Sequence, residues 1–253
     1  IGSYDYISQM DSPGNNSYMM YGYVKGRPLN ALWGFEYAGV WKSSEEIERN
    51  KITRAYVDAT TSVSAGTPRY VDQNHDGILD NQDLVYLGNA DPIIYGGLQN
   101  TFHIGRFKLG VYFTYSLGGK IYNYSELAMG GGNSSNQYRY MIDAWHPVRN
   151  PDSDLPRAGT DDILVPSDLQ IHDASYVRLS NVNLSYTFDL RKKTKALRDI
   201  TLSAVANNLY LWADYNGFDP DVSTESDGST LRRVDMGAYP RSRTIMFSVQ
   251  LRY

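Results

Sequence analysis

The chain has 253 residues (28.6 kDa), no cysteine, and 24 Lys and Arg against 28 Asp and Glu, a formal net charge of −4. This balance gives no basic footprint for nucleic acid, 42% hydrophobic residues exclude general disorder, and missing thiols exclude disulfide frameworks and thiolate metal sites. A mean hydropathy of −0.46 without a long apolar run excludes spanning helices, but it does not exclude spanning strands, in which polar and apolar residues alternate.

The first residue and the tyrosine content add two further constraints. The sequence starts at Ile1 with no Met and no apolar signal segment, so we expect a processed chain or part of a longer protein. The 22 Tyr favour surfaces where apolar and wet environments meet. A Tyr-rich soluble β-sandwich that binds sugars fits this composition equally well.

Two short helices are expected. Ser43 and Glu46 have the spacing of a capping box, which predicts a helix over residues 44–50. A weaker pattern over Tyr138–Trp145 ends before Pro147.

Strand patterns fill much of the second half of the chain. Apolar and polar residues alternate over 107–116, 181–188, 200–207 and 243–253. These segments approach the roughly 9 to 11 residues that a tilted strand needs to cross a bilayer, whereas soluble strands are nearer 5 to 6. Strand length therefore favours a membrane barrel.

Short and long connections alternate between these strands. A tight reversal surrounds Gly105, and a basic turn spans 190–199. Residues 118–174 and 213–241 are long, rich in Gly, Asn, Ser, Asp and Pro, and show no strand pattern. Outer-membrane barrels show this asymmetry, with short periplasmic turns and long extracellular loops.

These features predict an all-β fold, a transmembrane antiparallel β-barrel whose long extracellular loops contain short helices. The alternative is a soluble, calcium-stabilised β-sandwich that binds carbohydrate. The two differ in whether the apolar strand faces meet lipid or a second sheet.

Residues 72–83 match the loop of an EF-hand, with oxygen donors at positions 1, 3 and 5, Gly77 at position 6 and a carboxylate at position 12. The expected ligands of Ca²⁺ or Mg²⁺ are Asp72, Asn74, Asp76, Ile78 and Asp83. Because Asp83 replaces the usual bidentate Glu, we expect weak affinity, on the order of 10⁻⁴ to 10⁻³ M. The alternative is a turn rich in Asp and Asn that needs no metal.

Catalytic motifs are missing from the sequence. The four histidines are scattered, and neither H-E-x-x-H nor G-x-S-x-G occurs, so we expect no enzyme. Aromatic residues of the long loop could stack on sugar rings or peptide side chains, or else pack the loop on itself: Tyr122, Tyr124, Tyr138, Tyr140 and Trp145. Arg178 and Arg252 are expected to pair with carboxylates inside a barrel.

Several stretches, in this order, resemble one family. They are GRPLNALWGFEYAGVW (26–41), the 72–83 loop continued by LGNADP (87–92), SLGGKIYN (116–123), ASYVRL (174–179), YNGFDPD (215–221) and YPR (239–241). Together they are similar to the C-terminal part of the SusC/RagA-type TonB-dependent outer-membrane transporters of Bacteroidetes. The resemblance covers nearly the whole chain.

The resemblance implies an integral protein of the bacterial outer membrane that imports nutrients, mostly oligosaccharides and otherwise peptides. It implies a barrel of about 22 strands closed by an N-terminal plug, of which about seven strands fall within residues 1–253. The plug, the segment that contacts TonB and the earlier strands would lie in the remainder of the same transporter.

The resemblance also implies partners and an assembly signal. A SusD-like lipoprotein would cap the barrel, TonB would open it, and two transporter–lipoprotein pairs could form a dimer. The barrel-assembly machinery would recognise the C-terminal strand through Phe247, Val249, Leu251 and Tyr253. The substrate itself is not specified by the sequence.

Overall fold

The computed structural model describes residues 6–7, 22–23, 26–50, 53–54, 63–130, 136–159, 165–191, 196–224 and 233–253. The chain divides into two compact units. The sheet unit consists of Pro92–Gly119, Asp173–Asp221 and Tyr239–Tyr253. The loop unit consists of Ile1–Asp91, Lys120–His172 and Val222–Ala238.

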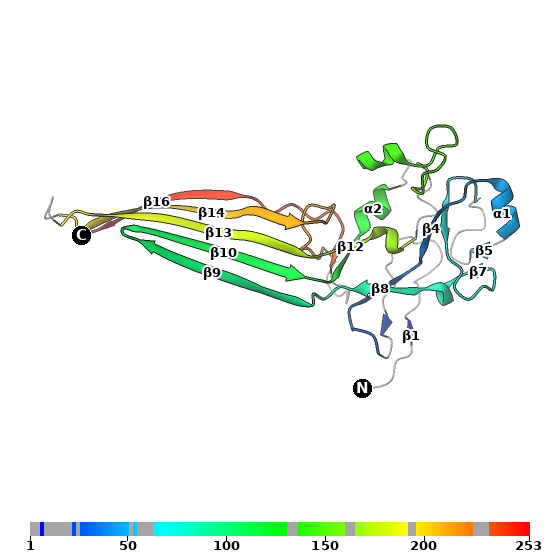
Figure 1. Ribbon diagram of the computed structural model, residues 1–253, viewed down its shortest axis with the longest axis horizontal. Coiled ribbons are helices and arrows are strands. Elements are labelled where there is room, and N and C mark those ends of the chain that lie inside the picture. The colour runs from blue at the N-terminus through cyan, green and yellow to red at the C-terminus, as the bar shows by residue number, and fades with distance from the viewer. Residues whose placement is uncertain are drawn as a thin grey trace. The chain divides into compact units, whose positions relative to one another are not determined.

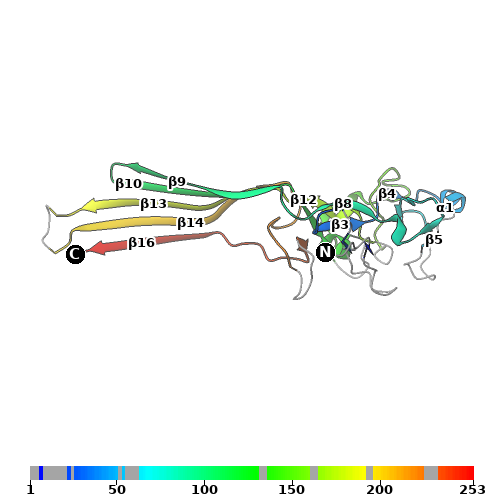
Figure 2. The same ribbon diagram turned by 90° about the horizontal axis from the view of Figure 1, so that it is seen from below.

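The sheet unit is built on one five-stranded antiparallel sheet with the order β16-β14-β13-β10-β9, and Figures 1 and 2 show these strands side by side. The strands are β9 (Ile94–Ile104), β10 (Phe107–Leu117), β13 (Tyr176–Asp189), β14 (Asp199–Ala213) and β16 (Thr244–Arg252). They are 9 to 15 residues long, well above the usual length in soluble proteins. In the described residues the sheet is open and does not close into a barrel.

The register of the sheet separates its two faces. Leu184 lies opposite Leu109 on one side and Ala204 on the other, and Ala204 lies opposite Phe247. The next residue, Asn183, lies opposite Gly110 and Val205. Because strand side chains alternate in direction, one face is almost wholly apolar and the other is mainly polar.

The apolar face is exposed. Ile245, Phe247 and Val249 are 64%, 83% and 65% exposed, and Phe102 and Leu184 are also exposed. A soluble sandwich would bury these side chains against a second sheet, so the described residues do not support that alternative.

All four predicted strands are present, and the structure extends three of them. Strand β13 begins at Tyr176 because a bulge at Ser180 restores the alternation further along, and β14 continues through Asn208, whose φ is +52°. Strand β9 had no predicted bounds, because Gly96, Gly97 and Asn100 interrupt its apolar pattern.

The loop unit contains short strand pairs. These are β1 (Tyr6–Ile7) with β2 (Gly22–Tyr23), β3 (Ala31–Gly34) with β8 (Val85–Asn89), β4 (Tyr37–Val40) with β6 (Pro68–Tyr70), β5 (Thr53–Arg54) with β7 (Ile78–Leu79), and β12 (Ile171–Asp173) with β11 (Lys120–Asn123) and β15 (Val234–Asp235). The prediction that 118–174 and 213–241 lack strands is therefore wrong at β11, β12 and β15. Such strands of two to four residues are too short to show an alternating pattern.

The helices are short. They are α1 (Ser44–Asn50), α2 (Tyr124–Met129) and the 3₁₀ turns η1 (Asn81–Asp83), η2 (Arg139–Asp143) and η4 (Asp168–Gln170). The α1 prediction is confirmed, and Ser43 Oγ accepts the Glu46 N–H at 3.2 Å. The expected helix over 138–145 is the shorter turn η2. Among the described residues no helix is long and apolar enough to span a membrane.

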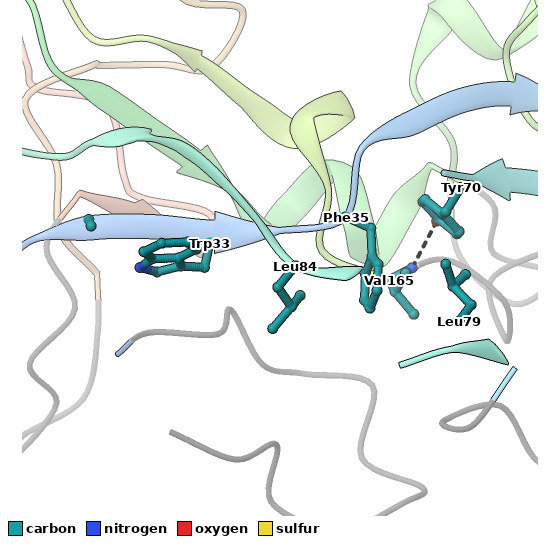
Figure 3. Close-up of a cluster of buried hydrophobic side chains, with 7 residues drawn as sticks. Trp33, Phe35, Tyr70, Leu79, Leu84 and Val165 are labelled. Atoms are coloured by element: carbon teal, nitrogen blue, oxygen red, sulfur yellow. Dashed lines mark hydrogen bonds between the residues drawn. The ribbon is translucent and has the colours of Figure 1, made fainter. Parts of the chain in front are cut away.

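Aromatic side chains build the core of the loop unit (Figure 3). Phe35 is fully buried, its ring centre lies 5.8 Å from that of Tyr70, and Tyr70 Oη accepts the Val165 N–H at 3.1 Å. Leu79 and Leu84, which flank the end of the 72–83 loop, pack into the same cluster. This core therefore anchors the loop expected to bind a cation.

Candidate functional sites

Aromatic rings lie at both ends of the sheet's apolar face. At the end with short turns, Tyr186 lies 4.5 Å from Phe107 and 4.6 Å from Phe188, measured between ring centres. At the other end, Trp212 lies 4.6 Å from Tyr210. Aliphatic residues occupy the rows between the two aromatic groups.

The spacing between these aromatic groups matches a lipid layer. Phe188 lies opposite Ile200, which is ten residues from Tyr210 on the same strand. At about 3.3 Å per residue and a tilt of about 40°, this separation corresponds to roughly 25 Å along a barrel axis. The lipid-facing band of outer-membrane barrels, flanked by aromatic girdles, has about this height.

The polar face carries a hydrogen-bonded row across three strands. Asn181 Nδ2 donates to Asn207 Oδ1 at 2.7 Å, and Asn207 Nδ2 donates to Thr244 Oγ1 at 3.1 Å. Thr187 and Thr201 share a further bond of 2.9 Å. These side chains satisfy one another and leave a surface compatible with a watery lumen.

A buried charge cluster holds both ends of the excursion between β14 and β16. Arg178 Nη2 donates to Asp219 Oδ1 at 2.6 Å, and Arg241 Nε lies 3.3 Å from Asp219 Oδ2. Arg241 Nη2 also donates to Asp221 Oδ2 at 2.7 Å. The expected carboxylate partner of Arg178 is confirmed, and Arg252 lies 3.5 Å from Asp199.

The acidic members of this cluster were not singled out by sequence reasoning. Asp219, Asp221 and Arg241 lie within the YNGFDPD and YPR stretches, so the signal was present, but their contact is made only in the tertiary structure.

The 72–83 loop is closed by its own hydrogen bonds. Asp72 accepts the His75 and Gly77 N–H groups at 2.7 and 2.9 Å. Asp83 is fully buried, and its two oxygens accept the N–H groups of Gln73 and Asp80, each at 2.8 Å.

The remaining expected ligands also act within the loop. Asp76 Oδ1 accepts the Ile78 N–H at 2.7 Å, and Asn74 Oδ1 accepts the Asp76 N–H at 3.0 Å. Over the part of the chain that the structure describes, no group of three or more His, Asp or Glu is placed to hold a metal ion. The arrangement fits the metal-free turn, and the cation site stays a prediction.

The aromatic residues proposed for ligand stacking divide into two groups. Tyr122 and Trp145 are 1% and 8% exposed, so they pack the interior instead of offering a ring face. Tyr124 packs at the edge of the same cluster as Tyr122. Tyr138 and Tyr140 stack with ring centres 5.5 Å apart and planes at 11°.

Tyr138 and Tyr140 lie near an acidic pair that the sequence reasoning missed. Glu126 Oε2 is 2.5 Å from His172 Nε2, and Glu126 is 8% exposed. Burial, reinforced by the charge of Glu126, raises the pKa of Tyr138 and that of Tyr140 above the ordinary value of 10. Both phenols therefore stay protonated, and able to donate hydrogen bonds, at neutral pH.

The proposed assembly residues lie on an edge of the sheet. Strand β16 pairs only with β14 in the described residues. Phe247, Val249 and Leu251 point to the apolar face, and Tyr253, which is 80% exposed, follows them at the C-terminus.

Comparison with known proteins places this architecture among the TonB-dependent receptors. No protein-family model matches the chain. TonB-dependent receptor P26 of Formosa agariphila is 29% identical over 240 residues, which are 91% of this chain and 23% of that receptor. Receptor P3 of the same organism is 26% identical over 238 residues, 90% of this chain and 22% of the receptor. SusC of Bacteroides thetaiotaomicron is 25% identical over 189 residues, 73% of this chain and 17% of SusC.

Solved structures agree on the fold. The RagAB peptide transporter aligns with a TM-score of 0.68 at 20% identity, covering 94% of this chain and 24% of that one. The RagAB peptide importer in its closed-closed state aligns with a TM-score of 0.62, covering 92% and 26%.

The chain is thus homologous, over about 90% of its length, to TonB-dependent receptors of the SusC/RagA type, and it spans about a quarter of their length. TonB-dependent receptors are integral outer-membrane proteins, which confirms the expected location. They are transporters, which agrees with the expectation that the chain is not an enzyme.

Proposed function

We propose that this chain forms part of the barrel wall of a transporter that imports nutrients across the outer membrane by TonB-dependent action. The main support is the five-stranded sheet, whose exposed apolar face is bounded by aromatic groups at a spacing suited to lipid. The remaining strands, the plug and the TonB-contacting segment would belong to the same transporter. In the closed barrel, they would pair with the open edges at β9 and β16.

The proposal includes a SusD-like lipoprotein as partner and an oligosaccharide or a peptide as substrate. The name SusC and the RagAB titles, which describe a peptide transporter, support these two classes. Dimerisation of two transporter–lipoprotein pairs is part of the same proposal. The loop unit would then lie on the extracellular side, because the long connections leave the sheet at one end.

A gel of the native outer-membrane fraction tests the barrel. An antibody to residues 136–159 should detect a band of roughly four times the mass of this chain that shifts on boiling, as folded barrels do. A band near 28.6 kDa that never shifts would overturn the proposal.

Growth on defined nutrients tests the transport activity. A strain lacking the whole transporter should fail to grow on one class of glycan or peptide as sole carbon source and should recover when the gene is restored. Pull-down with the tagged transporter should retain a surface lipoprotein encoded beside it.

We further propose that Tyr138 and Tyr140 contact the imported ligand. Their stacked rings, with Glu126 nearby, offer an apolar surface beside an acceptor for hydroxyl or amide hydrogens. Tyr140→Ala should weaken ligand binding on the order of tenfold, within the range for loss of a stacking aromatic. Tyr239→Ala, which removes a 91% exposed Tyr of the sheet unit, is the matched control and should bind normally.

A further inference from the structure

Basic side chains gather at the short-turn end of the sheet. The β9–β10 turn, the β13–β14 turn and the end of β16 together contain seven Lys and Arg against two Asp: Arg106, Arg191, Lys192, Lys193, Lys195, Arg198 and Arg252, with Asp189 and Asp199. The whole chain has a net charge of −4, so the remainder is strongly acidic. The positive charge is therefore concentrated at one end of the strands.

Backbone hydrogen bonds hold the described arginines together. The Thr187 N–H donates to the Arg106 carbonyl at 3.2 Å, which joins the two turns. The Arg198 N–H donates to the Arg252 carbonyl at 2.8 Å, which joins the second turn to the last strand. The arginines of three adjacent segments thus form one row along this end of the sheet.

The acidic residues of this end neutralise only part of the charge. Asp189 accepts two bonds from the Arg191 guanidinium, at 3.1 and 2.9 Å, and Asp199 lies 3.5 Å from Arg252. The side chains of Arg191 and Arg252 are still 66% and 64% exposed. Arg106 and Arg198 are exposed as well.

The row adjoins the aromatic group of the apolar face. Phe107 follows Arg106 directly, and Phe188 lies opposite Ile200, two residues after Arg198. In a membrane-spanning sheet, aromatic rings of this kind mark the interface, and the next layer outward contains lipid phosphates. Arginine binds phosphate through paired N–H donors, and its long stem lets the guanidinium reach the headgroup layer.

We propose that Arg106, Arg191 and Arg198 bind the phosphates of anionic phospholipids such as phosphatidylglycerol. The leaflet follows from the connections, because short turns face the periplasm in such barrels and the periplasmic leaflet is the phospholipid one. The inference rests on the proposed membrane-spanning function. It goes further by assigning a lipid class to one end of the sheet.

The test uses the complete transporter in phosphatidylcholine vesicles with and without an equal part of phosphatidylglycerol. Phosphatidylglycerol should raise the temperature at which the heat-shifting band is lost. The triple variant Arg106→Gln, Arg191→Gln, Arg198→Gln should lose this increase, and its retention of phosphatidylglycerol after purification should fall by about fivefold for each arginine removed.

The control variant Arg139→Gln, Arg149→Gln, Arg243→Gln removes the same charge from exposed arginines elsewhere and should behave as the wild type. An equal phosphatidylglycerol response in both variants would overturn the inference. A response to lipopolysaccharide vesicles alone would also overturn it, because that phosphate source belongs to the other leaflet. A wild type without a heat shift would instead contradict the proposed barrel.

Discussion

Asp219 is 1% exposed and contacts two guanidinium groups, Arg178 from β13 and Arg241 from the segment before β16. Burying a carboxylate is unfavourable unless charges and hydrogen bonds compensate it. Here Arg178, itself 5% exposed, and the Asp221 N–H supply that compensation. The cluster fixes both ends of the excursion between β14 and β16 within the sheet unit.

The first prediction concerns this cluster. Asp219→Asn should destabilise the folded transporter by about 3 to 5 kcal/mol, because Arg178 is left as a buried charge without its counter-ion. The measurement is the urea concentration at which the heat-shifting band is lost. Asp199→Asn, whose partner Arg252 is 64% exposed, is the control and should cost about 0 to 1 kcal/mol. Equal effects of both variants would show that burial does not govern the cluster.

At the scale of the strand, a shift of one residue exchanges lipid-facing for lumen-facing positions. Leu184 belongs to the apolar face and Asn183 to the polar face, although they are neighbours in the chain. The bulges in β13 at Ser180 and in β10 between Tyr112 and Phe113 change the register without exchanging the faces. Register is strongly specified in such a sheet because one of its faces avoids water.

The second prediction uses this alternation. Leu184→Arg should reduce the folded, heat-shifting fraction, since an arginine on the lipid face costs about 2 to 4 kcal/mol near the bilayer midplane. Asn183→Arg adds the same side chain to the lumen face and should fold nearly normally. Quantifying the unboiled and boiled bands for both variants is the measurement. If Asn183→Arg were the more harmful of the two, the proposed face assignment would be reversed.

The third prediction separates the structural and metal-binding roles of the 72–83 loop. Asp83→Ala should destabilise the loop unit by about 1 to 3 kcal/mol with or without Ca²⁺, because the N–H groups of Gln73 and Asp80 lose their acceptor. Asp76→Ala should matter mainly if a cation binds, because Asp76 is exposed and its bonds are local. Limited proteolysis of the whole transporter with Ca²⁺ and with chelator reports both effects.

Calorimetry gives the direct result for the cation. Heat release at millimolar Ca²⁺ that disappears in Asp76→Ala would support the metal site. Absence of binding, with Asp83→Ala still destabilised, would leave the loop as a turn held by hydrogen bonds alone.

For the whole molecule, the open edges of the sheet matter most. Strands β9 and β16 each have one neighbouring strand in the described residues, and the chain spans about a quarter of the homologous receptors. Exposed strand edges and a bare apolar face are aggregation hazards in water. We therefore expect the chain to be stable only within the complete barrel and its membrane.

The fourth prediction concerns assembly. Deletion of Tyr253 should lower the amount of transporter in the outer membrane severalfold, since the last strand with its terminal aromatic residue is the proposed assembly signal. Tyr253→Phe keeps the aromatic ring and should assemble normally. Surface labelling and the heat shift measure the outcome, and unchanged levels in the deletion variant would count against this role.

The sequence by itself determined the long strands, the helix at 44–50, the pairing of Arg178 with a carboxylate and the resemblance to the receptors. These features have local causes, namely alternation, capping and short motifs. Only the tertiary structure decided that Tyr122 and Trp145 are buried, that Asp83 caps backbone groups, and that Asp219 joins Arg178 to Arg241. Burial and long-range contact depend on which segments pack together, so no local pattern in a single chain reveals them.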